Sequence, residues 1–228
     1  MEPVRSHLLT APGRRRLADL GPLEQLRAGR LSRRLVQLTL GLALYGATLA
    51  AVVRATLGNA PWDVLHQGMA QHLPLTLGGA VILASAVVLL LWVPLRQRPG
   101  LGTIANAVLV GLAADATLAV LMAPESLEAR VALLLLGVVG NAVATAAYIG
   151  AQLGPGPRDG LMTGLHGRTG LPLGVVRTGL EVGVVALGFL LGGVAGLGTL
   201  LYALAIGPLV QWLLPPFVVE LDEPGSRG

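Results

Sequence analysis

The chain has 228 residues, of which 54% are hydrophobic and only 12% are charged, and it carries a formal net charge of +4 and no cysteine. A soluble domain usually has about 25% charged residues, so this composition excludes an ordinary soluble protein. The missing cysteines exclude disulfide, thiolate and cysteine–zinc chemistry. The mean hydropathy of +0.72 also argues against nucleic-acid binding, because basic residues in so apolar a chain are better explained as flanks of membrane helices. We therefore expect an integral membrane protein in contact with the lipid bilayer.

The N-terminal segment, residues 1–34, is strongly basic. It holds eight of the sixteen arginines: Arg5, Arg14, Arg15, Arg16, Arg27, Arg30, Arg33 and Arg34. Between Leu20 and Leu31 several leucines can share one helical face with arginines beside them, which suits the headgroup region of an anionic inner leaflet. A simple topology anchor explains the same residues. Both interpretations place this segment in the cytoplasm.

Six apolar stretches follow, each close to the roughly 20 residues that a helix needs to cross a bilayer core. They lie at about 35–53, 75–95, 101–122, 131–153, 175–191 and 197–214. Helices are expected because the backbone polar groups must pair within their own segment in lipid. An even number of spans places the short tail 216–228 in the cytoplasm with the N-terminus. We further expect the 96–100 turn inside and the 154–172 loop outside.

The two halves of the chain, 35–122 and 123–215, resemble each other. A shift of 96 residues aligns them without a gap, and the stretch 57–68 shares Leu, Gly, Pro, Asp, Leu and Gly with the stretch 153–164. Gly100 and Thr103 fall on Gly196 and Thr199 in the same register. Each half contains three spans, an odd number, so the second must enter the membrane from the opposite side. The sequence thus predicts an all-α membrane protein with a 3+3 inverted repeat, an arrangement found in many secondary transporters.

A short Pro-x-Asp helix is predicted after the first span of each half. Pro61 and Pro157 suit a first helical position, and Asp63 and Asp159 then lie in the first turn, where a carboxylate meets the positive helix end. The helix from Pro61 to His72 is too short to cross a bilayer. It can lie along the membrane surface or dip in as a re-entrant helix. The aspartates can cap their helices or take part in a permeation path.

Several polar residues are expected inside the spans, where they are candidates for function. Arg177 and Glu181 are one helical turn apart and can form an ion pair. The repeat places Val81 and Ser85 at their positions in the first half, so this pair has no charged counterpart there. The other candidates form two matched sets, Asn106 with Tyr202 and Asn141 with Tyr45. These four can line a central cavity or form interhelical hydrogen bonds.

The segments 22–30, Leu44-Tyr45-Gly46, 60–68 and 154–164 resemble the YczE-like bacterial membrane proteins, which are related to the YitT group. The resemblance covers nearly the whole chain. It implies a multi-pass protein of the bacterial plasma membrane. It brings no substrate and no catalytic residues.

Two functions are compatible with these features. The first is a small-solute or ion transporter, or a permease component, with its site between the two repeats. The second is a non-transporting membrane accessory or scaffold protein that supports another complex. A partner protein or a homo-oligomer fits either one. No nucleophile–base motif or metal-ligand set is present in the sequence, so we expect no enzyme activity, no metal and no cofactor.

Overall fold

The computed structural model describes residues 17, 18 and 20–222, and these form helices joined by short connections. The helices are α1 (Pro22–Arg27), α2 (Leu31–Ala55), α3 (Pro61–His72), α4 (Leu77–Leu95), α5 (Leu101–Val120), α6 (Leu127–Gly150), α7 (Pro157–Thr169), α8 (Leu173–Leu190) and α9 (Leu197–Phe217). Arg5, Arg14, Arg15 and Arg16 of the basic segment, and residues 223–228 of the tail, lie outside the described residues.

Six of these helices, α2, α4, α5, α6, α8 and α9, are long and apolar enough to cross a membrane, which confirms the predicted spans. Two of them begin one turn earlier than predicted. α6 starts at Leu127 because the Ser126 hydroxyl accepts a hydrogen bond from the Ala129 amide at 3.2 Å. α2 starts at Leu31 because the guanidinium of Arg34 is buried in its first turn rather than left in the aqueous flank.

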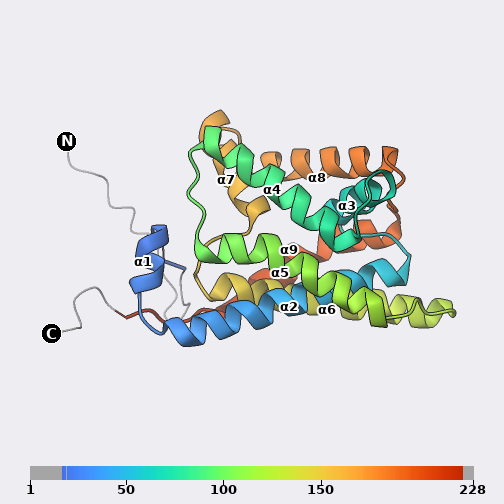
Figure 1. The fold of residues 1–228 in the computed structure, drawn as a ribbon, viewed down its shortest axis with the longest axis horizontal. Coiled ribbons are helices and arrows are strands. Elements are labelled where there is room, and N and C mark those ends of the chain that lie inside the picture. Colours follow the sequence, from blue (N-terminus) through green and yellow to red (C-terminus); the bar gives the residue numbers. More distant parts are fainter. Residues whose placement is uncertain (1–16, 19, 223–228) are drawn as a thin grey trace.

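The helices form two layers that run along the long axis of the molecule (Figure 1). α2 packs against both α5 and α6, and α6 packs against α9, so that these four form one layer. α4 and α8 lie on the other side, and the short helices α3 and α7 pack against both of them. Large apolar side chains such as Leu90, Leu136 and Trp212 are exposed on the outside, as expected for contact with lipid.

The two ends of the described chain lie at the same end of the bundle, on the left in Figure 1. The Asp222 amide donates to the Ala28 carbonyl at 3.0 Å, joining the segment after α9 to the end of α1. The end of α6 and the start of α5 meet at this end too, since the Gly102 amide donates to the Leu153 carbonyl at 2.6 Å. The expectation that the 154–172 loop lies opposite the 96–100 turn is therefore wrong. α6 runs back toward the end from which α2 starts, and the loop follows it there.

Arg34 holds this end together. Its guanidinium is fully buried and donates to the carbonyls of Ala151 at 2.8 Å, Gln25 at 2.5 Å and Gln152 at 2.5 Å. An arginine can be buried at low cost only when its donors are paired in this way. The basic segment thus contributes a structural clamp as well as exposed charge. α1 itself has no buried residues, and its Leu23 is 70% exposed.

The two short helices are confirmed as predicted, at Pro61–His72 and Pro157–Thr169. Each follows a glycine in the left-handed region, Gly58 with φ of 119° and Gly154 with φ of 116°. Only glycine adopts such angles without strain. These turns redirect the chain from the end of a span back into the bundle, so that each short helix starts inside the protein (Figure 1).

Candidate functional site

The N-terminal ends of α3 and α7 meet in the interior of the bundle. Nη2 of Arg158 lies 3.7 Å from Oδ1 of Asp63, and the guanidinium lies over the Trp62 ring, 5.1 Å from its centroid. An arginine above an indole face is an attractive cation–π arrangement. Trp62 and Arg158 are separated by 96 residues, so they hold the same position in the two Pro-x-Asp motifs and touch each other.

The two aspartates of the motifs have different partners. Oδ2 of Asp159 accepts hydrogen bonds from the Tyr148 hydroxyl at 2.8 Å and from the Gly156 amide at 3.2 Å. The second of these bonds caps α7. Asp63 is almost fully buried, and its Oδ1 lies 3.0 Å from Nδ1 of His66 on the next turn. Capping therefore describes Asp159, whereas Asp63 belongs to a buried cluster with His66 and Arg158.

A cavity of about 270 Å³ opens beside this junction. All three tyrosines of the chain, Tyr45, Tyr148 and Tyr202, line it. The charged lining residues are Arg158, Asp159, Arg177 and Glu181. A hollow of about 50 Å³ shares part of this lining and adds Asn106 and Pro157. Concave sites with a few convergent polar groups are typical of ligand binding.

Most of the residues selected from sequence gather here. Pro61, Tyr45, Asp159, Arg177, Glu181 and Tyr202 line the cavity, and Asn106 and Pro157 line the adjoining hollow. The predicted ion pair is confirmed, because Nε of Arg177 donates to Oε1 of Glu181 at 2.9 Å. Asn141 has a packing role instead. Its Oδ1 accepts from the Tyr202 hydroxyl at 2.6 Å, and its Nδ2 donates to Oγ1 of Thr48 at 3.1 Å.

The lining residues that were not selected from sequence include Arg158, Trp62 and Tyr148. The sequence did hold a signal for the first two. They are the one aligned pair within the two Pro-x-Asp motifs that combines a cation with a large aromatic ring. Tyr148 carried no comparable signal, because a tyrosine in an apolar span is ordinary.

On one side of the junction, α4 and α5, which line the adjoining hollow, pack tightly against each other. A Cβ atom added to Gly78 would lie 2.1 Å from the Gly111 carbonyl oxygen, so the two backbones are in direct contact. Asp115 of α5 fastens this contact. Its carboxylate accepts from the Thr76 hydroxyl at 2.5 Å and from the Gly78 amide at 2.7 Å.

On the other side α8 and α9 stand apart. Gly174 and Gly207 hold the positions equivalent to Gly78 and Gly111. A Cβ on Gly174 would meet nothing within 4 Å, and one on Gly207 would meet only Nη1 of Arg177, at 3.7 Å. The fastening is also missing in sequence, because Pro172 and Gln211 replace Thr76 and Asp115. The cavity lies in this gap, between Arg177 and Glu181 on α8 and Val210 and Gln211 on α9.

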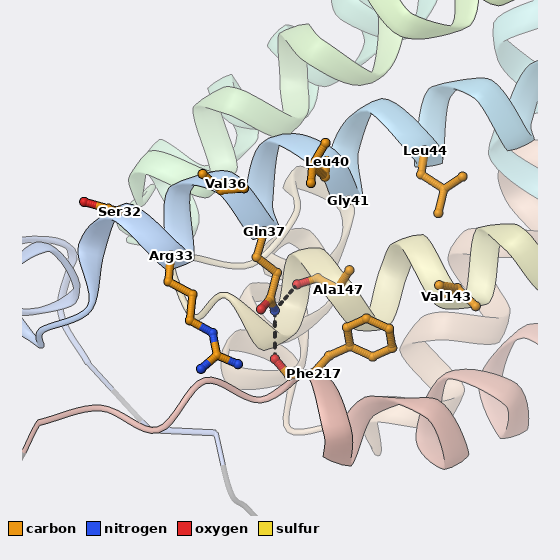
Figure 2. A pocket seen from close by; sticks show the side chains of 10 residues that line it. All are labelled: Ser32, Arg33, Val36, Gln37, Leu40, Gly41, Leu44, Val143, Ala147 and Phe217. Atoms are coloured by element: carbon orange, nitrogen blue, oxygen red, sulfur yellow. Dashed lines mark hydrogen bonds between the residues drawn. The ribbon is translucent and has the colours of Figure 1, made fainter.

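A second hollow of about 590 Å³ lies on the outside of the bundle, between α2, α6 and the end of α9 (Figure 2). Its lining is largely apolar, with Val36, Leu40 and Leu44 along one wall. The side-chain amide of Gln37 already has hydrogen-bond partners, since its Nε2 donates to the carbonyls of Ala147 at 2.9 Å and Phe217 at 2.7 Å. This groove has the character of a lipid-facing surface, and the polar chemistry lies in the inner cavity.

Among the described residues, no three His, Asp or Glu side chains gather as metal ligands do. Asp63 lies beside His66 and the cation of Arg158.

Comparison with known proteins places the chain in a family. A family of unknown function, DUF6198, matches residues 32–215. An uncharacterized protein of Haemophilus influenzae is 42% identical over 177 residues, which cover 78% of this chain and 81% of that protein. The uncharacterized membrane protein YczE of Bacillus subtilis is 33% identical over 184 residues, covering 80% of this chain and 85% of YczE. No solved structure matches the chain. The resemblance seen in the sequence is thus confirmed: the chain belongs to the DUF6198 family and is homologous to the membrane protein YczE.

Proposed function

We propose that the protein is a small-solute transporter of the bacterial plasma membrane, built as a 3+3 inverted repeat, with its binding site in the cavity between the two halves. The observation that carries the proposal is the cavity itself. It lies where the starts of α3 and α7 meet, it is lined by four charged residues and three tyrosines, and it extends into the gap between α8 and α9. Transporters with inverted repeats bind their substrates at such an interface, near discontinuous helices.

Reciprocal contacts support the inverted repeat. The Gly102 amide donates to the Leu153 carbonyl at 2.6 Å, and the equivalent Gly198 amide donates to the equivalent Leu57 carbonyl at 2.8 Å. Each bond joins one half to the other. A two-fold relation produces such pairs, because residue i of the first half meets residue j of the second while residue j of the first meets residue i of the second.

The packing of the spans has the same reciprocity. A Cβ on Gly41 would lie 2.9 Å from the Tyr148 amide, and one on the equivalent Gly137 would lie 2.7 Å from Cγ2 of Val52, which is equivalent to Tyr148. At the level of whole helices, α3 packs on α8 as α7 packs on α4. The contact of Trp62 with Arg158 then lies at the axis.

The orientation follows from the arginines. The connection from α4 to α5, with Arg96 and Arg98, and the end of α7, with Arg168, lie at the end of the bundle that carries α1 (Figure 1). Arg54 at the end of α2 and Arg130 at the start of α6 donate to the carbonyls of Leu118 and Ala55, at the opposite end. The positive-inside rule puts the richer end, and both termini, in the cytoplasm. Arg177 lies in the second turn of α8 and Gln211 lies in the last third of α9, so the gap between them faces the cytoplasmic end.

The two sides of the cavity support a cycle of alternating access. The contact of Gly78 with Gly111 closes the outer side, and the gap between Gly174 and Gly207 leaves the inner side open. The opposite state exchanges these arrangements, with α8 closed onto α9 and α4 separated from α5. A rigid-body movement of one group of helices against another accomplishes such an exchange.

The chain contains no cysteine, so the proposal can be tested with introduced cysteines in native membranes. In the double variant Pro172→Cys with Gln211→Cys, the thiols stand at the positions equivalent to Thr76 and Asp115, whose side chains are hydrogen-bonded at 2.5 Å in the closed pair. Closure of α8 onto α9 brings the two thiols together, and we expect oxidation to form a disulfide. A third cysteine in place of Met162, in the cavity wall, is then expected to lose its reaction with a membrane-impermeant maleimide added from the cytoplasmic side.

The control places cysteines at Pro172 and Gly183. Gly183 is on α8 itself, about three turns beyond Pro172, so no disulfide is expected. Failure of the Pro172–Gln211 pair to cross-link under any condition would mean that α8 does not close onto α9. That result, together with a fixed partner in purified samples, would favour the accessory-protein function.

A further inference from the structure

We propose that the solute is a small organic anion whose carboxylate or other oxyanion group binds the guanidinium of Arg158. This inference rests on the proposed function, because it assigns the substrate class of the same cavity. It starts from a mismatch between donors and acceptors among the charged groups that line or adjoin the cavity.

The guanidinium of Arg158 has unused hydrogen-bonding capacity. It carries five N–H donors in a fork that matches a carboxylate or phosphate. Within the described part of the chain its contacts are the Trp62 ring face and Oδ1 of Asp63, and the latter distance of 3.7 Å is too long for a hydrogen bond. The side chain is 22% exposed, toward the cavity. A partly exposed arginine whose donors are only partly paired can take a carboxylate or phosphate in bidentate fashion.

The nearby acidic groups, by contrast, already have partners. Asp159 accepts from the Tyr148 hydroxyl and the Gly156 amide, and Asp63 has His66 at 3.0 Å. Glu181 accepts from Nε of Arg177 at 2.9 Å, and Nη1 of Arg177 lies toward the gap, 3.7 Å from a Cβ added to Gly207. Three carboxylates thus face an environment that supplies donors to them, and the donors left over belong to Arg158 and Arg177.

The rest of the lining indicates an organic body. Tyr45, Trp62, Met162, Ile206 and Val210 provide flat and apolar walls around the charged end. A volume of about 270 Å³ corresponds to about nine waters at the ~30 Å³ each occupies in the liquid. That is room for one aromatic or branched aliphatic ring with a carboxylate, and it is generous for a bare inorganic ion.

Binding of an anion also accounts for the loose pairing of Asp63 with Arg158. The incoming oxyanion takes the guanidinium at hydrogen-bond distance, and Asp63 keeps His66 as its partner. Asp63 therefore acts as a competitor for the ligand, and its removal is expected to strengthen binding.

The experiment measures binding to purified full-length protein with three probes of equal shape: benzoate, benzyl alcohol and benzylamine. We expect benzoate to bind at least ten times more tightly than the other two by calorimetry. Arg158→Gln is expected to weaken benzoate binding by about tenfold or more, the loss of a charge-assisted hydrogen bond. Arg158→Lys keeps the charge without the fork, and we expect an intermediate loss. Arg33→Gln, on the outer groove, is the matched control with no effect.

Asp63→Asn keeps the test decisive if Arg158→Gln does not fold, since it is expected to tighten benzoate binding several-fold. Preference for benzylamine, or benzoate binding that ignores both Arg158→Gln and Asp63→Asn, would overturn the inference. The outcomes also separate the two proposals. If the cysteines at Pro172 and Gln211 cross-link on closure but no anion binds, only the substrate class fails. If benzoate binds through Arg158 and the cross-link never forms, the site stands and transport fails.

Discussion

The pair α4–α5 and the pair α8–α9 are aligned by the same 96-residue shift, yet one is closed and the other open. In the first pair Gly78 rests on Gly111, and in the second Gly174 and Gly207 are apart. The glycines are the same in both, so the small residues that permit close packing do not by themselves produce it. The difference lies in the groups around them.

Asp115 fastens the closed pair by accepting two hydrogen bonds from the start of α4. Its equivalent is Gln211, and the equivalent of Thr76 is Pro172, which has no hydroxyl to donate. The open pair instead carries Arg177 and Glu181, where the closed pair has the buried Val81 and Ser85. Charged groups need water or a ligand, so they favour the open arrangement. The two aligned helix pairs thus differ at four positions around the same glycines.

The largest effect is expected when Gly78 is replaced by alanine. The new Cβ would lie 2.1 Å from a backbone oxygen, and overpacking of this kind costs about 1–3 kcal/mol. Gly174→Ala is the matched control, with free space around its Cβ. Thermal unfolding in detergent should show a clear loss of stability for the first variant and little change for the second. Equal losses would mean that the α8–α9 gap is closed in the membrane.

Asp115→Ala is expected to come next. It removes both hydrogen bonds to the start of α4, and an unpaired buried donor costs about 1–3 kcal/mol. The variant should unfold at lower temperature, and a cysteine in place of Ala114 should gain reactivity toward maleimide from outside. Gln211→Ala is the control, with no such gain. If Asp115→Ala leaves the maleimide reactivity of the cysteine at position 114 unchanged, the Asp115 carboxylate does not hold α4 against α5.

A smaller effect is expected in the Asn–Tyr sets. Asn141 joins Tyr202 and Thr48 by hydrogen bonds, whereas Asn106 lines the small hollow. Interhelical hydrogen bonds in membranes contribute about 0.6–2 kcal/mol, so Asn141→Ala should destabilise the protein by about that amount and Asn106→Ala by less. Unfolding in increasing denaturant measures both. A larger loss for Asn106→Ala would reverse the assignment of packing to one residue and cavity lining to the other.

Glu181→Gln should change stability least. The ion pair with Arg177 is partly exposed, with side-chain exposures of 26% and 40%, and exposed pairs contribute about 0.2–1 kcal/mol. We expect the cross-linking of cysteines at Pro172 and Gln211 to rise in this variant, because the charge that favours the open gap is weakened. Thr178→Ala, between the two charged residues, is the control, and we expect no rise in cross-linking for it. If Glu181→Gln leaves cross-linking unchanged, the Arg177–Glu181 pair does not influence the closure of α8 onto α9.

Much of the architecture was readable because each signal was local. The six spans are long apolar runs, and the short helices start at Pro61 and Pro157, where the missing amide hydrogen costs nothing. The Arg177–Glu181 pair needs only a spacing of four residues in a helix. The 96-residue register depends on matched Gly, Pro and Asp that composition alone does not produce. The expected side of the 154–172 loop was wrong, because four spans return the chain to the side from which the first span starts. The contact of Gly102 with Leu153 shows this directly.

The site itself was only partly readable. Arg158 lies in the connection between two predicted spans, and its neighbours Trp62 and Asp63 are more than ninety residues away along the chain. Their contact exists because two left-handed turns, at Gly58 and Gly154, aim both short helices at one point. The different partners of Asp63 and Asp159 could not be predicted either. The two aligned motifs carry the same residue, but Asp63 lies beside His66 and Asp159 accepts from Tyr148 and Gly156.

The sequence by itself determined the membrane class, the six spans, the short helices and the register of the two halves, because these depend on hydrophobicity, helix geometry and residues a few positions apart. Only the tertiary structure decided which helix pair packs closely, α4–α5 and not α8–α9. It also decided that the guanidinium of Arg158 lies over the Trp62 ring, and that a cavity lies between Arg177 and Gln211. Those features depend on how closely helices approach each other. Close approach is a balance of backbone contact, paired polar groups and buried charge between segments distant in the chain.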